Sequence, residues 1–147
     1  MNVALALEVK KRVLAEPKRV FMGSWFEKVT KAMQKDEGGD EYKYLSCTTI
    51  GCIAGHTLFA ALTPAMITEV LKDDSGTIIQ DTAQGLLGLT KLNAEKLFFF
   101  MDASTSSYEN NIDYAAERTE LAKFKPGTRD YARVVAKAID KCIELNG

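Results

Sequence analysis

The apolar residues of this chain recur at the three- and four-residue intervals of amphipathic helices. Leu5, Val9 and Val13 lie four apart and are followed by a proline, so the pattern predicts a first helix over residues 2–15. A longer apolar stripe near the other end predicts a further helix, which Thr128 is placed to cap. The residues of that stripe are Tyr131, Val134, Val135, Ala138, Ile139, Cys142 and Ile143.

A second helix is predicted from Ser24 to about Gln34. The serine is followed three residues later by a glutamate, which is the spacing of a capping box. The apolar contacts of this helix would be Trp25, Val29 and Met33, which again lie four apart.

Small side chains dominate the middle of the chain. Thr48 or Thr49 can cap a helix through residues 51–62, and Thr63-Pro64 ends it and can start another short helix. The small residues of this helix are Gly51, Ala54, Gly55, Ala60 and Ala61. Because such side chains let neighbouring helices approach closely, we expect this helix to be buried at the centre of the fold.

The remaining segments also favour short helices. Residues 77–100 predict two helices around a Gly-Leu-Thr turn, with Thr90 or Asn93 capping the second. Another helix is predicted over residues 112–123, before the breaker Lys125-Pro126-Gly127. No alternating pattern is long enough to predict a strand. We therefore expect one all-α domain over residues 1–147, a compact bundle of about six short helices around a central small-residue helix.

Composition narrows the class of protein. The chain has 147 residues, of which 46% are hydrophobic and 27% charged, as in an ordinary globular domain. Nineteen basic residues against 20 acidic ones give a net charge of −1, so no global field attracts nucleic acid or an anionic membrane. No run approaches the roughly 18 apolar residues of a membrane span. Three cysteines, an odd count, favour reduced thiols and predict a cytoplasmic location.

Two motifs carry a resemblance to a family. The first is Cys47-x-Thr49-x-x-Cys52-x-Ala54-Gly55-His56, and the second is the later segment Ala83-x-x-Leu86-x-Gly88-Leu89-Thr90 with Ala94 and Leu97-Phe98 following. Over residues 20–100 the chain resembles a family of small bacterial and bacteriophage proteins of uncharacterised activity, which share a C-x-T-x-x-C-x-A-G-[W/H] core and an LGLT…LF segment. His56 stands where an aromatic residue is more common. The resemblance implies a phage or mobile-element origin and a role in host interaction or counter-defence, and it names no catalytic residue.

Cys52 and His56 are the residues most suggestive of chemistry. They lie four apart on a predicted helix, so their side chains share a face, and Cys47 lies just before it. These residues are candidate zinc ligands, although zinc takes four and the chain has a single histidine. They could also form a Cys–His nucleophile pair. The alternative is that small thiols and a hydrogen-bonded histidine pack the core, which the surrounding alanines favour.

The segment 83–98 has the outline of a helix-turn-helix. A recognition helix needs exposed polar and basic side chains, and this one offers Lys91, Asn93 and Lys96 before it becomes strongly apolar. A DNA-binding regulator is therefore one alternative function. Two helices that simply pack together are the other interpretation.

Two further features indicate binding of a partner. Arg129, Arg133, Lys137 and Lys141 recur every four residues and predict a basic stripe opposite the apolar one. Tyr42 and Tyr44 follow an acidic segment, residues 36–41, and exposed tyrosines are favoured at interfaces.

Together these patterns predict a non-enzymatic helical interaction module. We expect it to lack a cofactor and a catalytic residue, and to act by binding a protein, such as a host defence component, or by self-association. The DNA-binding regulator and the small zinc-binding protein are the alternatives.

Overall fold

The computed structural model describes residues 1–20, 22, 26–27, 50–72, 76–101 and 113–147. Within these ranges the chain is mostly helical, as the sequence predicts. The elements are α1 (Val3–Ala15), η1 (Pro17–Arg19), β1 (Phe26–Glu27), β2 (Ile50–Gly51), α3 (Ile53–Ala61), α4 (Pro64–Leu71), α5 (Gly76–Leu87), α6 (Lys91–Phe98), α7 (Ala115–Leu121) and α8 (Arg129–Asn146).

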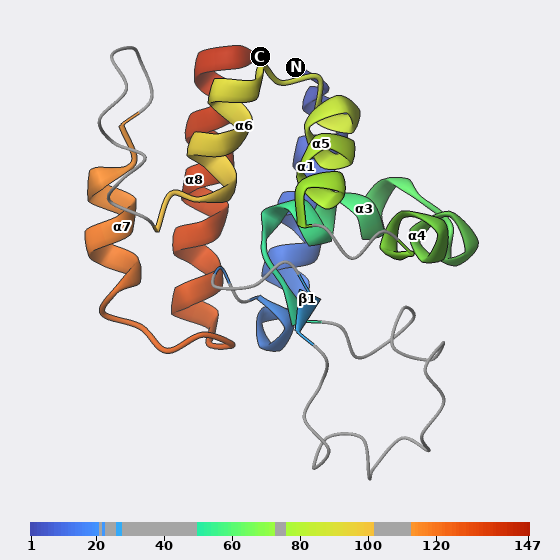
Figure 1. Cartoon of the computed structure of the whole chain (residues 1–147). Helices are drawn as coiled ribbons and strands as arrows, with labels where there is room; N and C mark the ends of the chain where they lie inside the picture. Colours follow the sequence, from blue (N-terminus) through green and yellow to red (C-terminus); the bar gives the residue numbers. More distant parts are fainter. Residues whose placement is uncertain (21, 23–25, 28–49, 73–75, 102–112) are drawn as a thin grey trace, which may run out of the picture.

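Helix α1 is the element that joins the two halves of the fold. It packs against α8 on one side and against α3 on the other, and α3 in turn packs against α5. Figure 1 shows the consequence: α7 lies at one edge of the molecule, outside α8, and the α3–α4 arm extends toward the opposite edge. The two ends of the chain lie close together, next to the turn between α5 and α6.

The core is a single apolar cluster that draws on nearly every described helix. From α1 it takes Ala6, Val9 and Val13, which follow one face of the helix. The largest fully buried side chains include Tyr131, Phe98, Phe100, Ile53, Leu58, Ile67, Leu87, Leu97, Leu121 and Ile139. The predicted stripe of α8 is confirmed, because six of its seven members are buried and the seventh, Ile143, is partly buried.

Three predicted helix starts are confirmed, each of them preceded by a threonine. Thr63, Thr90 and Thr128 have extended backbones, and each side-chain oxygen accepts a hydrogen bond from the amide three residues on. Asn2 caps α1 in the same way, by accepting from the amide of Leu5. These bonds satisfy amides that would otherwise lack a partner in the first turn.

The turn between α5 and α6 explains why the sequence needs a glycine there. Gly88 has a φ of 62°, in the left-handed region that favours glycine, and directly follows the last residue of α5. The amide of Leu89 donates back to the carbonyl of Gln84 and closes the helix end. Thr90 then caps α6. The Gly-Leu-Thr motif is therefore a helix stop followed at once by a helix start.

One predicted helix and the start of another were wrong. The helix predicted over 24–34 is contradicted at Phe26–Glu27, which forms strand β1 and pairs antiparallel with β2; the rest of that range, including Ser24 and its capping box, lies outside the described residues. The central helix begins at Ile53, because Ile50–Gly51 forms the partner strand and Cys52 is the N-cap. Helix propensity was outweighed here by pairing with a distant strand.

The small-residue helix is buried over most of its length. Ala54, Gly55 and Leu58 are buried, whereas Ala60 is partly buried and Ala61 is exposed at the end of α3. Helix α7 is shorter than predicted and spans Ala115–Leu121. No helix among the described residues is long and apolar enough to cross a membrane.

The cap of α8 gives the first testable prediction. Thr128→Ala removes the side-chain oxygen that accepts from the amide of Tyr131, so the free energy of unfolding should fall by about 1 kcal/mol. Thr119→Ala, in an exposed position of α7, is the matched control and should change it little. Urea unfolding measures both, and equal stabilities of the two variants would contradict the capping role.

Candidate functional site

The structure places Cys52 and His56 together at the start of α3. Cys52 is the N-cap residue and His56 lies one turn further on, where its amide donates to the carbonyl of Cys52 at 3.0 Å. Both are buried, with 2% and 4% of their surface exposed. Cys47, the third candidate ligand, lies outside the described residues.

His56 links α3 to the segment after α1. Its Nε2 lies 3.1 Å from the carbonyl oxygen of Arg19, and because a carbonyl only accepts, Nε2 carries the proton. A neutral ring in this tautomer presents Nδ1 as an acceptor, and Nδ1 is buried without a hydrogen-bond partner in the described part of the chain. The histidine thus joins α3 to η1 through one hydrogen bond.

Burial lowers the pKa of His56 to about 4. The Arg19 carbonyl opposes this shift, the guanidinium of Arg12 adds to it, and the carboxylate of Glu16 opposes it more weakly. The imidazole is therefore neutral at physiological pH.

Burial also raises the pKa of the Cys52 thiol to about 11, despite the amides of Gly55 and Ala54 at the start of α3, which act in the opposite direction. The thiol is therefore protonated at neutral pH. A Cys–His nucleophile needs a thiolate and access for a substrate. Neither is present in this arrangement, which supports the interpretation that the pair packs the core.

The zinc hypothesis gains no further ligand from the fold. Among the described residues no group of three histidine, cysteine or acidic side chains lies close enough to hold a metal ion. Cys142, the other described cysteine, is buried in α8. A site that includes Cys47 stays a prediction.

The segment predicted to resemble a helix-turn-helix forms the packed pair α5 and α6. Lys91 is exposed, but the side-chain amide of Asn93 donates to Asn146 at the end of α8, and Lys96 is only 5% exposed. Two of the three polar side chains proposed to read DNA are therefore turned into the fold. This geometry favours the packing interpretation.

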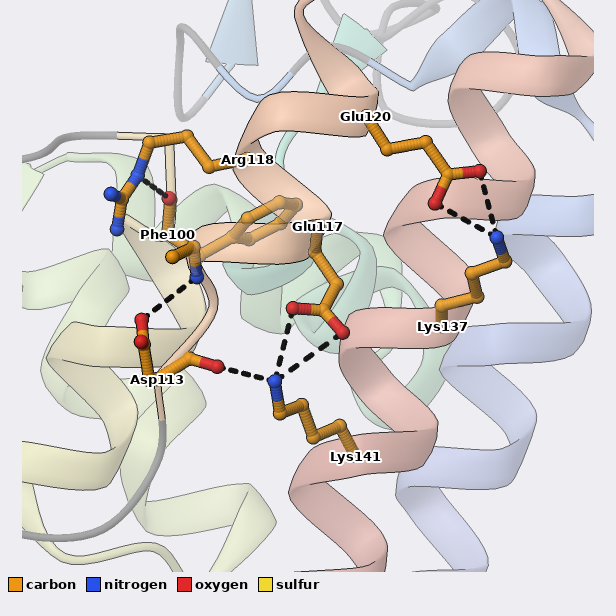
Figure 2. A network of polar contacts seen from close by, with 8 residues as sticks. Phe100, Asp113, Glu117, Arg118, Glu120, Lys137 and Lys141 are labelled. Atoms are coloured by element: carbon orange, nitrogen blue, oxygen red, sulfur yellow. Dashed lines mark hydrogen bonds and ion pairs between the residues drawn. The ribbon is translucent and has the colours of Figure 1, made fainter.

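The basic stripe of α8 divides into two halves. Arg129 and Arg133 are exposed, and Arg133 forms an ion pair with Asp130 on its own helix at 3.0 Å. Lys137 and Lys141 instead face α7 (Figure 2). Tyr42 and Tyr44, the other predicted contacts, lie outside the described residues.

Helix α7 covers the second half of the stripe with carboxylates. The Nζ of Lys137 lies 2.7 Å from Glu120, and that of Lys141 lies 3.1 Å from Glu117 (Figure 2). Lys141 also donates to the carbonyl of Asp113 and lies 5.5 Å from the centre of the Tyr114 ring. Two cations of the basic stripe, Lys137 and Lys141, are thus already paired with carboxylates of the same chain.

The pairing of these lysines with acidic residues of α7 was not predicted from the sequence. Glu117 and Glu120 lie three apart on a helix, a spacing that places both on one face, and this was the signal that could have paired them with the lysines.

A second missed feature is the outer face of α4. Met66 is 52% exposed, and Ala65 beside it is also exposed, while Ile67 is buried and anchors the helix. Val70, one turn after Met66 on the same helix, is partly buried.

Comparison with known proteins found no relative. No family model matches the chain, and neither the curated proteins nor the solved structures include a significant match.

The buried histidine gives the second prediction. His56 is the only histidine. Since its pKa falls from 6.5 to about 4 on folding, the unfolded chain binds a proton between these values and the folded chain does not, so stability drops as the pH falls through this window.

The reference variant is His56→Gln, whose amide can still donate to the Arg19 carbonyl. Between about pH 7.5 and pH 4, the free energy of unfolding of the wild type should fall by roughly 3 kcal/mol more than that of this variant. Urea unfolding at the two pH values measures this difference, in which the titration of the carboxylates cancels. An identical pH dependence of the two proteins would show that the imidazole is not buried in neutral form.

Proposed function

We propose that this chain is a non-enzymatic helical interaction module that acts by binding another protein. The observation that carries the proposal is the exposed apolar face of α4. This face consists of Ala65 and Met66, with the partly buried Val70 one turn after Met66 and the exposed Glu69–Lys72 ion pair beside them.

The composition of this region supports the proposal. Between Ile53 and Leu71 the only charged residue is Glu69, although the second half of that segment lies at the surface. An apolar stretch of this kind belongs in a core, and α3 does bury its first half. Helix α4, in contrast, exposes apolar residues at the surface. Exposed apolar surface bordered by polar groups is typical of interaction sites.

The geometry of α4 suits a preformed binding element. Pro64 and the Thr63 cap fix the start of the helix, and Ile67 holds it against the core. Met66 therefore projects from a fixed backbone, so little backbone entropy is lost when a partner buries it. Methionine adapts to irregular surfaces and is enriched at interfaces. The partner would supply an apolar groove for this helix.

The biological setting of the proposal comes from the resemblance of the two sequence motifs. It suggests a protein encoded by a phage or mobile element, with a host protein as partner and host interaction or counter-defence as the process. Cytoplasmic location follows from the three reduced thiols that the sequence predicts.

The third prediction tests the α4 face. Met66→Glu places a charge in the proposed interface, and because the side chain is 52% exposed the fold should stay intact. Leu145→Glu, at 54% exposure near the end of α8, is the matched control.

In affinity capture from host extract, the wild type and the Leu145 variant should retain the same protein, and the Met66 variant should retain it roughly tenfold less or not at all. Melting temperatures of all three proteins control for folding. Retention that is unaffected by Met66→Glu would contradict the proposal.

A further inference from the structure

We infer that α7 is a displaceable cover over the basic face of α8, and that α8 binds an acidic amphipathic helix of a partner protein in its place. The inference rests on the proposed protein-binding function. It concerns a different face from that of α4, and it also specifies the chemistry of the partner.

The contact between α7 and α8 has the form of a recognition complex. Glu117 meets Lys141 and Glu120 meets Lys137, so carboxylates three apart pair with lysines four apart on an antiparallel helix (Figure 2). Helical spacing places each pair of like charges on a single face. A partner helix with two carboxylates one turn apart would meet the same lysines.

Apolar anchors complete the pattern. Tyr114 and Leu121 lie at the two ends of α7, seven residues apart, and both are buried. Residues seven apart fall on the same side of a helix. The ligand that α8 fits therefore carries two large apolar side chains two turns apart, with the acidic residues between them.

Helix α7 is held by contacts that can be exchanged. It has seven residues, too few for a helix that is stable by itself. Beyond α8, its described contacts are to Phe100: the Arg118 guanidinium donates to the Phe100 carbonyl at 2.8 Å, and the Tyr114 ring lies 5.7 Å from the Phe100 ring. The Lys137–Glu120 pair is partly exposed, and exposed ion pairs are weak and screened by salt, whereas the Lys141–Glu117 pair is more buried.

Helix α8 does not depend on α7 for its place in the fold. It has 18 residues and also packs against α1, α6 and η1. Lys10 of α1 forms an ion pair with Asp140 of α8 at 2.7 Å. Undocking of α7 would leave these contacts in place.

A partner helix longer than α7 would form more ion pairs with α8 than α7 forms. Arg129 and Arg133 continue the same row of cations for two more turns and are exposed, beyond the part that α7 covers. An incoming acidic helix can therefore pair with Arg129 as well as the two lysines, and with Arg133 once its ion pair with Asp130 is exchanged, whereas α7 pairs with the two lysines alone. This difference gives the partner an advantage over the intramolecular competitor.

The test uses the chain's own α7 as the probe, as a fluorescent peptide of residues 113–124. In the full chain, Glu117→Lys with Glu120→Lys should repel α7 from α8 and free the lysines. Glu8→Lys with Asp81→Lys is the control, because both positions are exposed and the net charge changes equally. Fluorescence anisotropy measures the affinity of each protein for the peptide.

The peptide should bind the Glu117/Glu120 variant at least about tenfold more tightly than it binds the wild type or the control. Adding Lys137→Glu and Lys141→Glu should abolish this binding. Equal affinity for the control, or equal binding of a scrambled peptide with the same charge, would overturn the inference, since nonspecific attraction of anions, nucleic acid included, would then explain the result.

A second measurement covers the case in which the variant does not fold. In the wild type, hydrogen exchange of the α7 amides should accelerate at about 1 M salt while that of α1 stays unchanged. Identical responses of α7 and α1 would overturn the inference. Because Met66 takes no part in either measurement, the two binding surfaces can fail independently.

Discussion

Close packing of α1 between α8 and α3 is the constraint on which the rest of the structure depends. Each of the three helices buries an alanine almost completely, namely Ala6, Ala132 and Ala54, and small side chains let helix axes approach closely. Bulkier residues at such positions would separate the helix axes and leave the aromatic side chains of the core without partners. Other helices pack onto this group, α5 against α3 and α7 against α8.

The same packing decides what the chemically suggestive residues can do. Cys52 and His56 lie where α3 meets the segment after α1, and burial there keeps the thiol protonated and the imidazole neutral. The two proposed binding surfaces lie elsewhere, on the apolar face of α4 and on the basic face of α8 beneath α7. The α4 face offers apolar surface on a fixed helix, and the α8 face offers positive charge.

Much of the fold could be predicted because it is encoded locally. A capping threonine or a proline marks a helix boundary in the sequence itself, as at Thr63-Pro64 and Thr128. The pairing of Phe26 with Gly51 could not be predicted, because strands of two residues carry no periodic signal and depend on a distant partner. The candidate sites divide in the same way: periodicity predicts a basic stripe on α8, but only tertiary structure shows Glu117 and Glu120 covering it.

The most direct test of the account is the stability of Ala54→Leu measured by urea unfolding. Ala54 is fully buried in α3, so a larger side chain should force the neighbouring helices apart and lower the free energy of unfolding by about 1–3 kcal/mol. Ala61→Leu adds the same side chain at the exposed end of the same helix and should leave stability nearly unchanged. A leucine at position 54 tolerated as well as one at position 61 would mean that α3 has free space around it, and that the packing described above is wrong.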